Sequence, residues 1–387
     1  MPRIVWILSL VSLFADMASE MLYPVLPLYL REIGFSVFLL GVLEGVAECT
    51  AGISKGYFGK KSDESGLRLP YIRGGYLLSA LSKPLMVVAS FPLWIFGVRT
   101  LDRLGKGLRT AARDAMLAGA STSSNKARIF GFHRGMDTLG AFFGPLIALV
   151  FLHFLPGQYR PLFLWALIPG LLSVLLLFLL REKRSPSSTL QRKGFFSYFG
   201  YWKKSSAEYR KLVSALLLFT LFNSSDVFLL LKTKELTGSD TLTISAYLFY
   251  NLIYALAAYP AGIWADRQRY GTVMGTGLLL FALVYGGFAA GPSTPWVFGL
   301  FLLYGLFAAC TEGLAKAWIA HFAPATDTGT AIGLYTSGQS LAALGSSTLA
   351  GWIWVAAGSQ WTFLISAMMA TGLSLLFYFK KFAEPPR

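Results

Sequence analysis

Four acidic residues near the start of the chain form two pairs, each with a spacing of four. Asp16 and Glu20 make one pair, and Glu44 and Glu48 make the other. A spacing of four places both members on one face of a helix. A carboxyl group in a low-dielectric site holds its proton more tightly than in water, so it can exchange a proton near neutral pH. Carboxylate oxygens also bind hard cations, so both chemistries stay open.

A row of basic residues follows, at spacings of three and four that keep it on one helical face. The row is Arg99, Arg103, Lys106, Arg109 and Arg113. Guanidinium groups suit carboxylate and phosphate, so the row predicts an anion site or salt bridges that exchange as a cavity opens. Two structural alternatives remain. The first two arginines can pair with the acids above, and the last two can snorkel to lipid headgroups.

Other polar residues recur within apolar stretches and are predicted to bind substrate or form salt bridges. Glu312 and Lys316 are four apart, in the order that favours a helical ion pair. The sequence favours a helical ion pair and a role in the cavity equally for these two residues. The same two interpretations apply to Arg134 and Asp137. The remaining members of this predicted set are Asp102, Tyr23 and Asn251.

The amino-acid composition indicates whether these charges belong to a soluble or a membrane protein. Of 387 residues, 55% are hydrophobic and only 14% charged, with a mean hydropathy of +0.56. Soluble domains are about a quarter charged, so a soluble globular protein, a disordered chain and a disulfide scaffold are excluded. The net charge of +15 follows from basic loops of a membrane protein and does not indicate nucleic acid.

Apolar stretches of roughly 20 residues, enough to cross a bilayer, predict twelve membrane spans. The first six cover residues 4–30, 36–56, 70–90, 92–118, 127–153 and 159–181. The second six cover residues 209–232, 241–264, 270–290, 294–322, 328–355 and 358–380. We therefore expect a bundle over residues 1–181, a basic cytoplasmic linker over 182–208 and a second bundle over 209–387.

Basic residues predict the orientation of the chain. With the N-terminus inside, 22 of the 34 lysines and arginines lie on the cytoplasmic side and four outside. This asymmetry follows the positive-inside rule, so both termini are predicted to be cytoplasmic in an inner membrane. The first span is too acidic for a signal peptide and is expected to be retained.

The two halves also repeat each other. A shift of 206 places Glu20 on Asp226 and Gly56 on Gly262. Residues 262–267 (Gly-Ile-Trp-Ala-Asp-Arg) resemble the signature loop of the major facilitator superfamily, in which Gly allows close helix approach and Asp-Arg latches a cytoplasmic gate. The first-half counterpart, residues 56–61 (Gly-Tyr-Phe-Gly-Lys-Lys), has Lys60 where the Asp is expected.

Three further stretches carry the resemblance. Residues 99–115 resemble the charged fourth helix of a branch of the superfamily with largely unassigned substrates, and residues 311–317 resemble the tenth helix of that branch. Residues 140–145 (Gly-Ala-Phe-Phe-Gly-Pro) look like the kink of proton antiporters. The resemblance implies an all-α polytopic protein with twelve transmembrane helices in two six-helix bundles. It also implies a cytoplasmic gate made by Gly56, Lys60, Arg109, Arg113, Asp114, Gly262, Asp266 and Arg267.

In that fold spans one, four, seven and ten line a central cavity, and here charges concentrate on spans one, two, four, five, seven and ten. The sequence thus predicts a secondary active transporter that moves a small organic solute by alternating access, coupled to protons through Glu20, Asp226 and Asp16. The alternatives are a metal-ion or siderophore transporter, and a membrane-embedded enzyme or receptor.

No enzyme, cofactor or metal site is expected. No nucleophile lies beside a base, no GxxxxGK[ST] motif is present, and no His clusters with the acids. The expected partners are a small-molecule substrate, protons and lipid, and the protein is expected to be a monomer.

Overall fold

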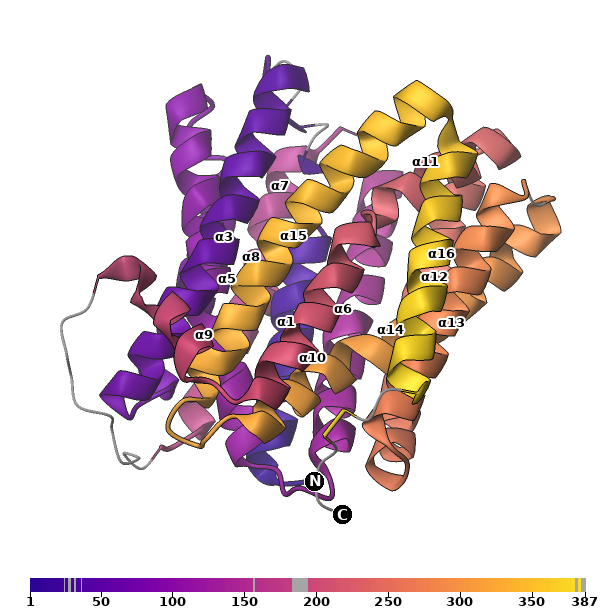
Figure 1. The fold of residues 1–387 in the computed structure, drawn as a ribbon. Coiled ribbons are helices and arrows are strands. Elements are labelled where there is room, and N and C mark those ends of the chain that lie inside the picture. Colours follow the sequence, from indigo (N-terminus) through magenta and orange to yellow (C-terminus); the bar gives the residue numbers. More distant parts are fainter. Residues whose placement is uncertain are drawn as a thin grey trace. The chain divides into compact units, whose positions relative to one another are not determined.

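The structure is a computed structural model. It describes residues 1–23, 25–26, 29–30, 33–35, 37–155, 157–182, 194–291, 293–379 and 382–383, without the side chains of residues 37, 38, 40, 41, 44, 240 and 241. These parts of the chain are almost entirely helical and contain no strand (Figure 1).

The helices follow one another with short connections. The first half holds α1 (Arg3–Glu20), α3 (Val37–Ser65), α4 (Leu69–Leu85), α5 (Pro92–Gly119), α6 (Lys126–Phe154), α7 (Tyr159–Trp165), α8 (Leu167–Leu176) and the 3-10 helix η1 (Leu177–Leu179). The rest holds η2 (Phe195–Gly200), α9 (Tyr201–Lys204), α10 (Ala207–Phe222), α11 (Asp226–Thr237), α12 (Asp240–Arg267), α13 (Tyr270–Ala289), α14 (Thr294–Phe322), α15 (Thr328–Ala357) and α16 (Ser359–Phe379).

Most boundaries lie within a few residues of the predicted spans, because hydropathy is a local property. The described chain has eight helices long and apolar enough to cross a membrane, and all of them lie after residue 125. The four earlier spans do not reach that composition. In α5 seven ionisable side chains interrupt the apolar surface, so the helix that carries the basic row is also one that hydropathy detects least well.

Two predicted spans are interrupted where an acid stands. α1 ends at Glu20 and the chain turns at residues 21–23. α10 ends at Phe222, and α11 starts at Asp226 after Ser225, whose hydroxyl accepts the Val227 N–H at 3.4 Å. The acids that the sequence repeat pairs therefore both stand at helix ends within a span.

Contacts divide the chain into two compact units. Unit 1 comprises residues 1–120, 136–204 and 323–340. Unit 2 comprises residues 121–135, 205–322 and 341–387. Each unit draws on both halves of the sequence, because the starts of α6 and α15 pack with helices of the opposite half. The division into bundles at residues 181 and 209 stays a prediction.

Small residues bring the helices of unit 1 close together. A Cβ on Gly75 of α4 would lie 2.6 Å from the carbonyl oxygen of Gly105 of α5, and the reverse distance is the same. This backbone contact positions the basic row of α5.

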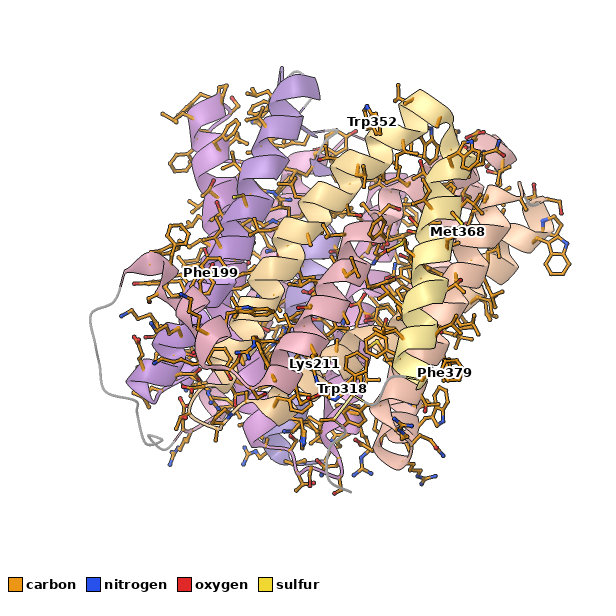
Figure 2. All side chains as sticks on the ribbon, in the orientation of Figure 1. Phe199, Lys211, Trp318, Trp352, Met368 and Phe379 are labelled. Carbon is orange, nitrogen blue, oxygen red and sulfur yellow. The ribbon has the colours of Figure 1, made fainter. Side chains whose placement is uncertain are left out.

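Large apolar side chains face outward in unit 2. Trp352 of α15 and Met368 and Phe379 of α16 project from their helices and are more than half exposed (Figure 2). Apolar surface of this kind is suited to lipid.

Candidate functional site

A polar cavity lies in unit 1. Residues of α1, α4 and α5 form most of its wall. Its ionisable residues are Asp16, Glu20, Lys83, Arg99, Asp102, Arg103, Lys106 and Arg109. An apolar part of the wall is formed by Leu22, Tyr23, Leu26, Met86 and Phe163. The cavity thus joins the first acidic pair to the predicted basic row.

Asp102 holds together the cations of the cavity wall. Its carboxylate lies 3.6 Å from the Lys83 ammonium, 3.5 Å from the Arg99 guanidinium and 3.9 Å from Nε of Arg103. Ser79 donates a hydrogen bond of 2.6 Å to the same carboxylate. Lys83, absent from the predicted site, is buried and donates to the Ser79 carbonyl at 2.8 Å. One carboxylate therefore serves three cations.

Glu48 of α3 forms an ion pair with another part of the row, at 3.2 Å from Nη1 of Arg103. This is the structural pairing that the sequence left open for Arg103. The Glu44 side chain lies outside the described part of the structure, so its predicted role is not tested.

The last two arginines of α5 do not snorkel to lipid. Arg109 and Arg113 are 3% and 7% exposed, so the lipid-anchor interpretation is wrong. The Arg113 guanidinium donates to Asp114 at 3.0 Å and to Ser12 of α1 at 2.9 Å. The Arg109 guanidinium lies 4.2 Å from the centroid of the Tyr76 ring. Both reach into the interior of the unit.

A buried carboxyl group of α6 lies beside these arginines. Asp137 is 5% exposed, accepts a hydrogen bond from Ser12 of α1 and lies 3.9 Å from Arg113. Asp16 follows Ser12 by four residues on α1, so the two lie on the same face of that helix.

The glycines of the predicted kink in α6 serve close packing. A Cβ on Gly144 would lie 2.9 Å from the Cβ of Glu20, and one on Gly140 would lie 3.1 Å from the Cβ of Asp16. Any larger residue would push α6 away from the acidic face of α1.

Unit 2 has its own polar cluster, rich in tyrosine. The Tyr304 hydroxyl of α14 donates to Asp226 at 2.6 Å. The Tyr250 ring lies 4.9 Å from Tyr304 and 6.1 Å from Tyr254. Asn251 is buried beside them and its amide donates to the Tyr247 carbonyl at 3.0 Å.

Arg134 forms the ion pair of this second cluster. Its guanidinium contacts Glu312 of α14, and its Nε donates to the Tyr254 hydroxyl at 2.7 Å. Arg134 and Asp137, which the sequence grouped together, thus bond to different helices in different units. Lys316 lies one turn after Glu312 on α14 and is partly buried.

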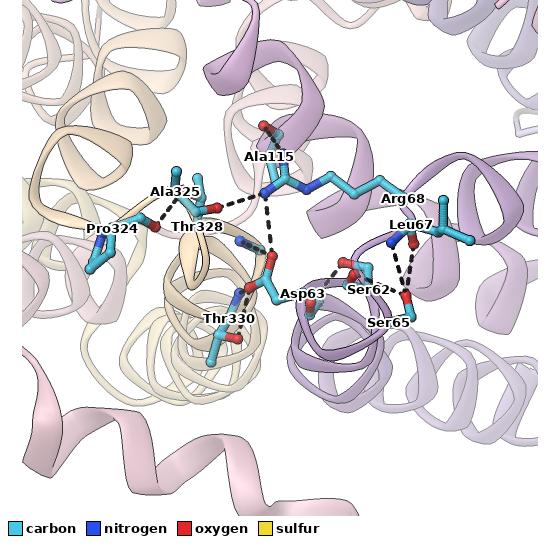
Figure 3. Close-up of polar contacts among 12 residues, drawn as sticks. Ser62, Asp63, Ser65, Leu67, Arg68, Ala115, Pro324, Ala325, Thr328 and Thr330 are labelled. Carbon is cyan, nitrogen blue, oxygen red and sulfur yellow. Dashed lines mark hydrogen bonds and ion pairs between the residues drawn. The ribbon is translucent and has the colours of Figure 1, made fainter. Parts of the chain in front are cut away.

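Asp63, near the C-terminal end of α3, caps the start of α15 (Figure 3). Its carboxylate accepts the N–H groups of Gly329 and Thr330 at 3.2 and 2.6 Å and the Thr330 hydroxyl at 2.9 Å. Arg68 lies 3.5 Å away and also donates to the carbonyls of Ala115 and Ala325. A carboxylate at a helix N-terminus satisfies open N–H groups and opposes the helix dipole.

Asp266 makes the corresponding contact in unit 2. It accepts the N–H groups of Ala127 and Arg128 at the start of α6, both at 2.9 Å. Gly59 and Gly262 each stand four residues before the capping aspartate. A Cβ on Gly59 would collide with the Gly329 carbonyl, and one on Gly262 would lie 2.6 Å from the Ala127 carbonyl.

The predicted register of the first-half loop is therefore wrong. Gly59 and Asp63 match Gly262 and Asp266 at a shift of 203, whereas the sequence comparison used 206 and placed Lys60 at the aspartate position. Lys60 instead pairs with Glu64 at 3.5 Å and donates to Ser197 at 2.6 Å. The first-half loop therefore does contain an aspartate that corresponds to Asp266, and this residue is Asp63.

A tyrosine of the linker closes the contact between α3 and α15. Tyr198 of η2 is buried, and its ring fills the space that a Cβ on Gly56 would occupy. Its hydroxyl hydrogen-bonds to Ser337 of α15, which itself accepts the Gly56 N–H at 3.0 Å and donates to the Gly52 carbonyl at 2.6 Å. Gly56 thus belongs to the interface, with a partner that the sequence did not reveal.

The metal-ion alternative stays a prediction, because the Glu44 side chain lies outside the described part of the structure. No three His, Cys, Asp or Glu side chains within the described ranges are placed to hold a metal. Glu48 and Asp102 are occupied by cationic side chains.

Comparison with known proteins identifies the family. The model of the Major Facilitator Superfamily matches residues 8–250 and 212–387. The chain belongs to the Major Facilitator Superfamily. An uncharacterized MFS-type transporter of Methanocaldococcus jannaschii is 30% identical over 383 residues, covering 96% of this chain and 94% of the relative. This MFS protein is therefore a transporter in a membrane and not an enzyme.

Solved structures of other transporters have the same fold. The human organic anion transporter MFSD10 superposes with a TM-score of 0.81 at 18% identity and covers 97% of this MFS chain and all of its own. The Escherichia coli fucose:proton symporter has a TM-score of 0.77 at 14% identity, with 97% and 98% coverage. The twelve-helix MFS fold predicted from the sequence is confirmed.

Sequence reasoning missed four residues of the transporter that the structure connects to the predicted site: Lys83, Asp63, Tyr198 and Ser337. Asp63 had a usable signal, because it repeats the Gly-x-x-x-Asp spacing of residues 262–266. Tyr198 had none, because its partners lie more than 130 residues away in the chain.

Proposed function

We propose that this MFS protein moves a small organic solute across the inner membrane by alternating access and couples that movement to protons. It acts as a monomer with both termini in the cytoplasm. The single observation that carries the proposal is the position of Asp16 and Glu20 in the wall of a cavity lined with cations.

Proton coupling requires a carboxyl group that binds a proton in one conformational state and releases that proton in another. Asp16 and Glu20, on one face of α1 at the cavity, are the proposed proton carriers of unit 1. The nearby cations on α5 favour the ionised form of these acids, so a small change in their distance changes proton affinity. The same fold serves a fucose:proton symporter, which is consistent with this chemistry.

Asp226 is the proposed proton carrier of unit 2. It repeats Glu20 at the break between α10 and α11, and its hydrogen bond to Tyr304 holds it inside the tyrosine cluster. Discontinuous helices that place polar groups at the midplane are typical of transporter sites.

The two aspartate caps support alternating access. They join α3 to α15 and α12 to α6 at the predicted cytoplasmic ends. Each cap is made of a few hydrogen bonds and one glycine contact, so it can separate without unfolding a helix. We assign the gate to these two contacts and extend the predicted gate residues to include Asp63.

The test is proton movement in proteoliposomes containing a pH-sensitive dye and an imposed pH gradient. Carboxylates, sugars, amino acids and amines are added one at a time, and the expected result is substrate-dependent proton flux. Glu20→Gln, Asp16→Asn and Asp226→Asn should each abolish that flux.

Glu235→Gln is the control, because Glu235 is half exposed and pairs only locally with Lys232. Proton coupling would be contradicted if solute uptake did not depend on the pH gradient and was unchanged in all three variants.

A further inference from the structure

We propose that the cavity of unit 1 binds an organic anion, whose carboxylate or phosphate lies at Lys106 and Arg109 and whose apolar part lies against Met86 and Phe163. The proposal deepens the proposed function, on which it rests for the transport step. Binding itself needs no proton gradient, so the two can fail separately.

The charge of the cavity wall favours an anion. Five cations line the cavity: Lys83, Arg99, Arg103, Lys106 and Arg109. Three acids line it: Asp16, Glu20 and Asp102. The excess among these lining residues is two positive charges with all three acids ionised, and Glu48, which pairs with Arg103, reduces it to one. A charge within a bilayer is costly unless it is paired, so the remaining cationic charge favours an anionic partner.

The excess is located at two residues. Asp102 neutralises the cations toward the start of α5, and Glu48 adds a second carboxylate at Arg103. Among the side chains that the structure describes, no carboxylate forms an ion pair with Lys106 or Arg109. Lys106 is exposed at the cavity, and Nη1 of Arg109 is buried with no hydrogen-bond partner in the described structure. A buried guanidinium nitrogen without an acceptor is costly, and a ligand oxygen at the cavity would supply one.

The acids of α1 do not replace such a ligand. Neither Asp16 nor Glu20 forms an ion pair with the two cations in the described structure. A neutral or cationic solute would leave the excess charge uncompensated, whereas a carboxylate or phosphate suits Lys and Arg together.

The apolar wall sets the kind of anion and its orientation. Met86 follows the end of α4 and Phe163 lies in α7, near the predicted outer ends of their spans. Arg99 and Arg109 are ten residues apart on α5, or about 15 Å along the helix. A ligand with its charged group at Lys106 and Arg109 therefore extends its apolar part away from the predicted cytoplasmic side. The site suits an amphipathic organic anion better than an inorganic ion.

The test compares four probes with one ring and different charge: benzoate, phenyl phosphate, benzylamine and benzyl alcohol. The purified full-length protein is heated with each probe at constant ionic strength, since a ligand of the folded state raises the Tm. We expect the two anions to raise the Tm saturably and the amine and alcohol to leave it unchanged. Lys106→Gln should weaken the apparent affinity for the anions about tenfold, Lys106→Arg should retain it, and the surface variant Lys211→Gln should bind like the parent.

The same variants distinguish a ligand-binding lysine from a structural one. Without probe, Lys106→Gln should keep or raise the Tm, because it removes repulsion from the neighbouring cations. A lower Tm in that variant, or the absence of any anion-dependent shift in the parent protein, overturns the proposal. Equal shifts with benzylamine overturn the anion class. None of these results bears on substrate-dependent proton flux, which the proteoliposome assay measures.

Discussion

The two aspartate caps repeat one backbone contact but differ in their surroundings. Asp266 accepts two N–H groups of α6 and the Tyr270 hydroxyl at 3.3 Å, and it remains partly exposed. Asp63 is 5% exposed, accepts three hydrogen bonds from α15 and faces Arg68. Among the described linker residues, Tyr198 packs into the α3–α15 contact as a tyrosine wedge at Gly56, and none does so at the α12–α6 contact. Both contacts share a close-approach glycine and a capping aspartate. The facing arginine and the packed tyrosine belong to the α3–α15 contact.

The difference indicates that the two contacts are unequal in strength. Removal of a buried hydrogen-bonding partner costs more than removal of an exposed one, so the α3–α15 contact should separate last. Four predictions test this inequality, from the largest effect to the smallest.

The largest effect is expected from a side chain at either close-approach glycine. Gly59→Leu and Gly262→Leu should each lower the Tm strongly or prevent purification of folded protein, because the new Cβ would meet backbone atoms that cannot move aside. Gly97→Leu is the control, since nothing lies within 4 Å of its Cβ position. Normal stability in the first two variants would show that the backbone contact is dispensable.

Loss of the tyrosine wedge should affect one contact only. Tyr198→Ala should cost about 3 kcal/mol, as for other buried aromatic truncations. The interface is monitored by maleimide labelling of Ser337→Cys, with Cys49→Ser and Cys310→Ser as background. Labelling should accelerate in Tyr198→Ala, whereas a cysteine at the other contact, Ala127→Cys, should react at an unchanged rate. Equal acceleration at both cysteines would argue against a local wedge.

The two capping acids should differ by about a factor of two. Asp63→Ala should cost about 2 kcal/mol and Asp266→Ala about 1 kcal/mol, measured as loss of thermal stability. The surface variant Glu235→Ala should be neutral. Equal losses, or a greater loss at Asp266, would mean that burial does not set the strength of these contacts.

The smallest effect is a pH dependence at Asp63, which lies beyond the predicted span 36–56. Burial raises the pKa of this carboxyl from 3.8 to about 6, and Arg68 and the bonds from Thr330 and Gly329 offset part of the rise. The folded protein therefore binds this proton more tightly than the unfolded chain. The resulting stabilisation is complete below about pH 3.8 and is lost as the pH rises through about 6.

Stability should thus decrease by about 1 kcal/mol between pH 5 and pH 7 through this group. The measurement is the Tm across that range in the parent and in Asp63→Asn. The variant should show a flatter profile, and identical profiles would exclude Asp63 as the titrating group.

Much of the fold was predictable because the relevant signals are local. Hydropathy located the ends of α12, α13, α14, α15 and α16 within a few residues. The period of the basic residues placed Arg99, Arg103, Lys106 and Arg109 on one wall of the same cavity.

Register and pairing were less predictable because they depend on distant parts of the chain. The halves of the protein repeat at a shift of 206 around Glu20 but at 203 around Asp63, since connections of different length separate the helices. A single shift therefore misplaced the first-half loop. One alternative paired Arg99 and Arg103 with acids of the first two spans. Arg103 does contact Glu48, but the carboxylate shared by Arg99 and Arg103 is Asp102 on their own helix.

The sequence by itself determined that the protein is a helical membrane protein with a strongly charged fourth predicted span, because composition and periodicity are properties of the chain alone, and its family resemblance predicted a transporter. Only the tertiary structure decided which charges neutralise each other, which aspartate caps which helix and where cations remain for a ligand. Those outcomes depend on which helix faces approach each other. Approach is controlled by glycine contacts such as Gly59 with Gly329, whose significance appears only when helices from opposite ends of the chain are in place.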